Sequence, residues 1–258
     1  MARLKMPGVS DTVSVDLANQ VATVTLDRPA VLNAIDREQR QNLEMVFRAL
    51  EVHDQVRVVV LQGAGTSFSS GQDQKESATM DAQAAAGRVE DYVRMFKAVR
   101  ALGKPVIARL HGYANGTGLH LAFLADLRIA TATAKLGMTD LAVGSTAILA
   151  SAILRSLVGE AVMRRLVLYS DFVTAAEALS MSLVHEVHPE DGIDARVADL
   201  AADLATRPPL AVTLTKQWWR RMGDAMFDAA VDQARVADAR NFDSGGLSEG
   251  AAGFLPRG

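Results

Sequence analysis

The chain has 258 residues, of which 49% are hydrophobic and 22% charged, and its formal net charge is −3. This composition is ordinary for a globular domain, and the slightly acidic balance gives no electrostatic reason to expect a nucleic-acid partner. The lack of cysteine excludes disulfides, thiolate metal sites and a cysteine nucleophile. Because no secretory leader and no apolar run of membrane-spanning length is seen, we expect a cytoplasmic protein.

Strands alternate with helices through the first three quarters of the chain. Five aliphatic, β-branched segments are expected to form strands, at residues 21–26, 56–63, 105–112, 127–131 and 183–187. Apolar residues at helical spacing predict helices after Asp36, around residues 89–99, and near residues 145–158 and 160–181. This alternation is typical of βαβ units and favours an α/β fold with a largely parallel sheet.

The last quarter is expected to be helical. Residues 193–204, 208–221 and 223–242 have helical patterns, and we place a boundary between a core at 1–192 and a helical region at 193–258. The polar, alanine-rich segment 72–87 is expected to be a mobile loop that leads into a helix.

Two glycine-rich loops each follow a predicted buried strand: GAGTSFSSGQD at 63–73 and HGYANGTGLH at 111–120. Ligands gather at the carboxyl ends of parallel strands, and each loop can offer a backbone N–H to one carbonyl oxygen, as an oxyanion hole does. Ordinary helix-capping turns explain the glycines equally well. Neither loop completes a nucleotide-binding motif, and the five histidines lack close metal-ligand spacing, so no metal site is expected.

Four segments, in this order and spacing, resemble the crotonase superfamily of enoyl-CoA hydratases and isomerases. They are RPAVLNAID at 28–36, GTSFSSGQD at 65–73, KPVIARLHGYANGTGLHLAFLADLRIAT at 104–131 and AKLGMTDLAVG at 134–144. The resemblance covers nearly the whole chain, including the tail that begins RPPLAVTLTKQ.

The resemblance implies a crotonase-like spiral of βαβ units, a C-terminal helical trimerisation region, and a homotrimer or dimer of trimers. The implied ligand is an acyl-CoA thioester, with no tightly bound cofactor. By position, the oxyanion N–H groups belong to Gln72 and Thr117. The residues implied to border the coenzyme A are Arg28, Ala30, Val31, Leu32 and Gln74. Near the chain end, Arg257 is a candidate partner for the CoA phosphates.

The sequence departs from the family pattern at the two acids. Family hydratases hold a water molecule between two glutamates, whose positions match His120 and Asp140 here. Because a histidine ordinarily changes charge near neutral pH, His120 is the predicted general acid/base, with Asp140 as its orienting carboxylate. A buried, neutral core histidine and a helix-capping aspartate are the structural alternatives.

Three functions remain open from the sequence. The first is a hydratase or isomerase that uses the His/Asp pair. The second is another crotonase-type reaction, the hydrolysis of a thioester or of a carbon–carbon bond. The third is an acyl-CoA-binding paralogue without catalysis.

Overall fold

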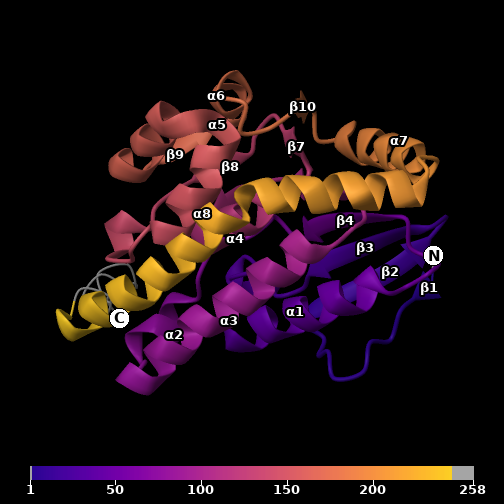
Figure 1. The fold of residues 1–258 in the computed structure, drawn as a ribbon. Helices are drawn as coiled ribbons and strands as arrows, with labels where there is room; N and C mark the ends of the chain where they lie inside the picture. Colours follow the sequence, from indigo (N-terminus) through magenta and orange to yellow (C-terminus); the bar gives the residue numbers. More distant parts are fainter. Residues whose placement is uncertain (1, 246–258) are drawn as a thin grey trace.

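The computed structural model describes residues 2–245 of the chain. Its main sheet has seven strands in the order β1-β2-β3-β4-β5-β7-β10 (Figure 1). The strands from β3 to β10 run parallel, while β1 and β2 are antiparallel additions at one edge. Their bounds are β1 Ala2–Arg3, β2 Val13–Ala18, β3 Val21–Leu26, β4 Val58–Gly63, β5 Val106–Leu110, β7 Leu127–Thr131 and β10 Glu186–His188.

Helices cover both faces of this sheet. Alternate residues of β4 point to opposite faces, so Val59 and Leu61 join the core shared with α1 (Arg37–Glu51) and α3 (Ala82–Ala101). Val58 and Val60 instead pack against α7 (Ile193–Ala205). The prediction that this strand is buried on both faces is therefore confirmed.

A second, three-stranded sheet lies beside the first. It consists of β6 (Tyr113–Asn115), β8 (Lys135–Gly137) and β9 (Phe172–Thr174), in that order. Two helices directly follow its strands: α4 (Gly116–Phe123) follows β6, and α6 (Ala175–Ser180) follows β9. The structure also has two single-turn 3-10 helices, η1 (Pro29–Val31) and η2 (Leu141–Val143).

The break expected between helices at 145–158 and 160–181 is present, because α5 (Ile148–Tyr169) has a non-helical φ of 77° at Gly159. The second of these helices is shorter than expected and ends at Tyr169. Residues beyond it form β9 and α6, because Thr174 and Glu177 make a reciprocal capping box that begins a new helix.

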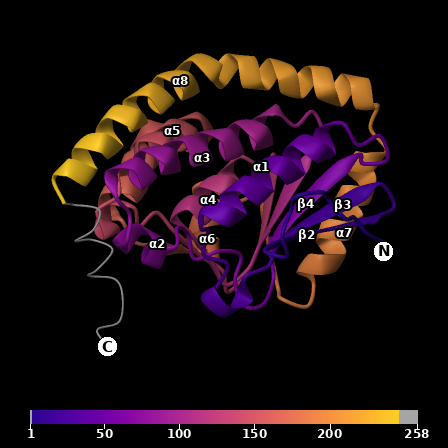
Figure 2. The ribbon, with the colours of Figure 1, turned by 90° about the horizontal axis from the view of Figure 1, so that it is seen from below.

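The pair of helices expected at 208–221 and 223–242 is a single helix, α8 (Pro209–Asp243). Gly223 lies inside α8, where a glycine costs about 1 kcal/mol relative to alanine. Packing of α8 along α3 and α5 outweighs that cost (Figure 2). Phe227, Val231 and Ala234 are buried in this contact.

The expected mobile loop at 72–87 is also wrong in part, because it contains helical structure. Asp73 accepts a hydrogen bond from the N–H of Lys75 and begins α2 (Gln74–Ala78). Asp81 caps α3 in the same way, through the N–H of Ala84. Each aspartate satisfies an N–H that the helix itself leaves without a partner.

The predicted boundary after residue 192 falls between β10 and α7. Helix α7 packs against the main sheet, whereas α8 packs along α3 and α5. The division into a core and an oligomerisation region stays a prediction. Among the described residues, no helix is long and apolar enough to cross a membrane.

Candidate active site

The two glycine-rich loops lie against each other. Ser69 and Ala114 form an isolated parallel bridge, in which the Asn115 N–H donates to the Ser69 carbonyl at 3.0 Å. A Cβ atom on Gly118 would lie 2.5 Å from the Ser69 side chain, and one on Gly71 would lie 2.8 Å from the Asn115 carbonyl. Glycine is therefore required at both positions for the loops to approach this closely.

This contact places the backbones of Gln72 and Thr117 beside one pocket. In the parallel bridge to Ile35, the hydrogen bonds are made by the neighbours of Gln72, because Ile35 N–H donates to Gly71 and Asp73 N–H donates to Ile35. The Gln72 N–H therefore faces away from Ile35. Thr117 is the second residue of α4, and the first four N–H groups of a helix have no intrahelical acceptor. Among residues 2–245, neither N–H makes a loop or turn hydrogen bond.

A histidine and an aspartate lie next to each other in the wall of the same pocket. Nε2 of His120, on α4, lies 3.4 Å from Oδ2 of Asp140, which precedes η2. His120 is 6% exposed, and its ring meets the ring of Phe96 edge-on. Within residues 2–245, neither Nε2 nor Oδ2 has a hydrogen-bond partner. Two buried polar atoms without partners are unusual and are expected where a ligand or water binds.

The four predicted catalytic residues border one cavity of about 60 Å³. A second cavity, of about 130 Å³, shares Gln72, Thr117 and Asp140 with the first, and Gln74 also lines it. The structure thus brings together Gln72, Thr117, His120, Asp140 and Gln74.

Most of the residues predicted to border coenzyme A lie outside both cavities. Ala30, Val31 and Leu32 are exposed on and after η1. The guanidinium group of Arg28 is engaged by Asp36 at 3.0 Å and by Asp73 at 3.2 Å. These contacts tie the 28–36 segment to the start of α2.

Several residues of this cavity were not predicted from the sequence. Arg88, Tyr92 and Phe96 lie on one face of α3, four residues apart, and Asp238 approaches from α8. The sequence analysis used the apolar residues around 89–99 only as evidence for a helix. The signal that could have indicated a site is Arg88, a charged residue that shares a helical face with Tyr92 and Phe96. Burial raises the pKa of the Tyr92 hydroxyl, and the guanidinium groups of Arg40 and Arg88 only partly oppose this. The Tyr92 hydroxyl is therefore neutral and can donate a hydrogen bond.

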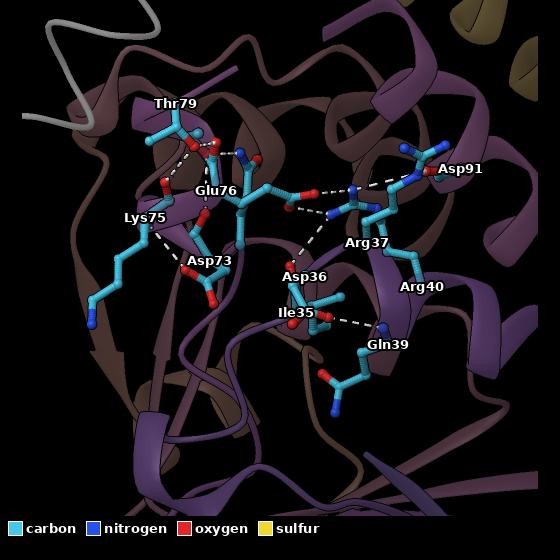
Figure 3. A network of polar contacts seen from close by, with 12 residues as sticks. Ile35, Asp36, Arg37, Gln39, Arg40, Asp73, Lys75, Glu76, Thr79 and Asp91 are labelled. Atoms are coloured by element: carbon cyan, nitrogen blue, oxygen red, sulfur yellow. Dashed lines mark hydrogen bonds and ion pairs between the residues drawn. The ribbon is translucent and has the colours of Figure 1, made fainter. Parts of the chain in front are cut away.

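A buried ion pair supports the loop that carries Gln72. Arg40 of α1 is almost fully buried and donates two hydrogen bonds of 2.8 Å to the carboxylate of Glu76 in α2 (Figure 3). Asp91 of α3 lies 3.9 Å from the same guanidinium. The Gln72 side chain is in turn hydrogen-bonded to Ser77. This network joins α1, α2 and α3 beside the loop that carries Gln72.

The described part of the chain contains no group of three or more histidine, aspartate or glutamate side chains placed to hold a metal ion. Arg257, the candidate partner of the CoA phosphates, lies outside the described residues.

Comparisons of sequence and structure agree on one family. The model of the enoyl-CoA hydratase/isomerase family matches residues 16–255. (E)-benzylidenesuccinyl-CoA hydratase of Thauera aromatica is 35% identical over 207 residues, which cover 80% of each chain. Short-chain-enoyl-CoA hydratase of Clostridium acetobutylicum is 28% identical over 251 residues, covering 96% of this chain and 95% of the relative. An enoyl-CoA hydratase structure from Mycobacterium avium subsp. paratuberculosis has a TM-score of 0.86 at 26% identity, covering 94% and 98% of the two chains.

The fold and the match along the chain define a crotonase-type protein, and the predicted fold class is confirmed. The chain belongs to the enoyl-CoA hydratase/isomerase family, whose members are enzymes of acyl-CoA metabolism.

Proposed function

We propose that this protein hydrates the α,β double bond of an enoyl-CoA thioester. The observation that carries the proposal is the convergence of two free N–H groups and a His/Asp pair on one cavity of about 60 Å³. The N–H groups of Gln72 and Thr117 hold the thioester oxygen. They stabilise the negative charge that develops there when a nucleophile adds to the β carbon.

His120 and Asp140 supply the nucleophile. A water molecule that donates one hydrogen to Nε2 and the other to Oδ2 satisfies two atoms that otherwise have no partner. As the water oxygen bonds to the β carbon, Nε2 takes its proton and the double-bond electrons pass to the thioester oxygen as an enolate. The proton then returns to the α carbon, which restores neutral histidine and completes the addition of one water molecule. Asp140, 3.4 Å from Nε2, stabilises the imidazolium between these steps.

Two relatives support hydration, because both are named as hydratases. The name of the Thauera aromatica relative also includes a succinyl group, so that enzyme acts on an acyl group with a second carboxylate. Hydration is therefore preferred here to thioester hydrolysis and to non-catalytic binding.

The test is incubation of the full chain with crotonyl-CoA and a panel of enoyl-CoA thioesters, followed by mass spectrometry. Hydration yields a 3-hydroxyacyl-CoA, whereas hydrolysis releases free CoA. The variant Asp140→Asn keeps the shape of the side chain but removes its charge, so we expect a slower reaction in a folded protein. Free CoA as the main product, or binding without turnover, would contradict the proposal.

We also infer that the protein assembles as a homotrimer or a dimer of trimers and works in the cytoplasm. The assembly is supported by the exposed apolar residues of α8, among them Leu210, Leu214, Trp218, Trp219 and Met222. A patch of this kind on a lone subunit is typical of an interaction surface.

A further inference from the structure

Arg88 is a charged side chain buried in the wall of the proposed acyl cavity. It comes from α3, is 4% exposed, and lines the same cavity as Thr117 and His120. Arginine is rarely buried to this extent unless its charge is paired and its N–H groups have acceptors. The partners of Arg88 therefore indicate what the cavity is built to hold.

The hydrogen-bonding capacity of Arg88 is mostly unused. Its Nη2 contacts Oδ2 of Asp238 at 3.3 Å, while the other oxygen of Asp238 accepts a hydrogen bond of 2.6 Å from Thr146. Nε and Nη1 of Arg88 are buried and have no acceptor among residues 2–245. A guanidinium has five N–H groups, so the three on Nε and Nη1 are without a partner.

A second donor lines the same cavity. The Tyr92 hydroxyl, one helical turn from Arg88, is buried, and the Thr117 side chain lies close enough to donate to its oxygen. The hydrogen of the Tyr92 hydroxyl has no acceptor within the described part of the chain. The guanidinium of Arg88 is close enough to act electrostatically on this hydroxyl. The α3 wall thus presents a positive charge and several donors to the cavity that the His/Asp pair also lines.

We propose that this cavity selects a short acyl group with a second carboxylate, which Arg88 binds with the help of Tyr92; this rests on the proposed binding of acyl-CoA thioesters. A carboxylate can accept hydrogen bonds from several N–H and O–H donors at once. Its negative charge also complements the positive charge of Arg88. The acyl group is short because Thr117, at the thioester end, and Arg88 line a single cavity of about 60 Å³.

Asp238 does not fill this role by itself. Its charge is shared between Arg88 and the Thr146 hydroxyl, and its side chain is 20% exposed. It holds one edge of the guanidinium, which orients the group and leaves Nε and Nη1 for the ligand.

The test compares succinyl-CoA with butyryl-CoA by titration calorimetry. Both have four-carbon acyl groups, but only the first ends in a carboxylate. Hydrogen bonds to charged groups correspond to roughly a 10- to 100-fold change in affinity, so wild type should bind succinyl-CoA tighter by that factor. Arg88→Met should abolish this preference and change the affinity for butyryl-CoA less than about threefold.

Two further variants separate recognition from structural support. Arg100 is another arginine of α3, and it pairs with Asp224 of α8 at 3.1 Å. Arg100 lies outside this cavity, so Arg100→Met is the control. It should keep the preference for succinyl-CoA. Asp238→Asn removes the competing carboxylate of Arg88 and should keep or increase the preference.

The outcomes distinguish this inference from the proposed function. Equal binding of the two thioesters by wild type would overturn the carboxylate site and leave enoyl-CoA hydration intact. Binding of neither thioester would overturn both. The comparison of succinyl-CoA with butyryl-CoA on wild type tests the carboxylate site even if Arg88→Met does not fold.

Discussion

Replacing His120 by leucine should separate activity from stability. The side chain is 6% exposed, and its Nε2 makes no hydrogen bond within residues 2–245. The substitution therefore breaks no hydrogen bond at Nε2. Leucine has a similar volume and packs against Phe96, which now meets the imidazole edge. A volume-conserving core substitution usually costs less than about 1.5 kcal/mol in the free energy of unfolding.

The effect on the rate should be far larger. General acid–base catalysis contributes about 10²–10⁴-fold, which is about 3–5 kcal/mol of activation free energy. The assays are the initial rate of hydration of crotonyl-CoA and the urea midpoint of unfolding, measured on the same preparation. His188→Leu is the control, because His188 is paired with Glu186 on β10 and lines neither active-site cavity.

Two results would refute this reasoning. If His120→Leu hydrates crotonyl-CoA at the wild-type rate, His120 is not the acid/base group. If the variant instead loses more than about 2 kcal/mol of stability while the surviving folded protein keeps full activity, His120 is a structural core residue.

Three other predictions concern packing, assembly and pH. Gly118→Ala would bring a Cβ to 2.5 Å from the Ser69 side chain, so unfolding in urea should show a loss of about 1–3 kcal/mol, and the hydration rate should fall with it. Replacing the tryptophans at 218–219, which are 59% and 54% exposed, by glutamate should reduce the mass seen by light scattering to that of a monomer; an unchanged mass would place the interface elsewhere. Arg196 holds the pKa of Glu186 at about 2, below its usual 4.5, so this carboxylate stabilises the fold fully above pH 4.5 and loses that effect as the pH falls towards 2. The difference in Tm between wild type and Glu186→Gln should narrow over that range, and a difference independent of pH would contradict the assignment.

Much of the main sheet could be predicted because its signals are local. Residues 58–61 are all apolar, and the structure buries Val59 and Leu61 against α1 and α3 and Val58 and Val60 against α7. The strands of the second sheet were missed because three residues are too few to show a periodicity. Two helices were expected at 208–221 and 223–242 because helical spacing is a local signal, whereas the packing that keeps α8 continuous is not.

The sequence by itself predicted the segments that carry the proposed site. Gln72 lies in the first glycine-rich loop, Thr117 and His120 lie in the helix that follows the second, and Asp140 comes just before η2. The glycines of the two loops already indicate that two backbones must come close. Only the tertiary structure decided what faces them. Arg88 and Asp238 are 150 residues apart and meet because α8 folds back along α3. Whether a buried N–H has an acceptor depends on every element packed around it, so the unused donors of Arg88 and Tyr92 became visible only in three dimensions.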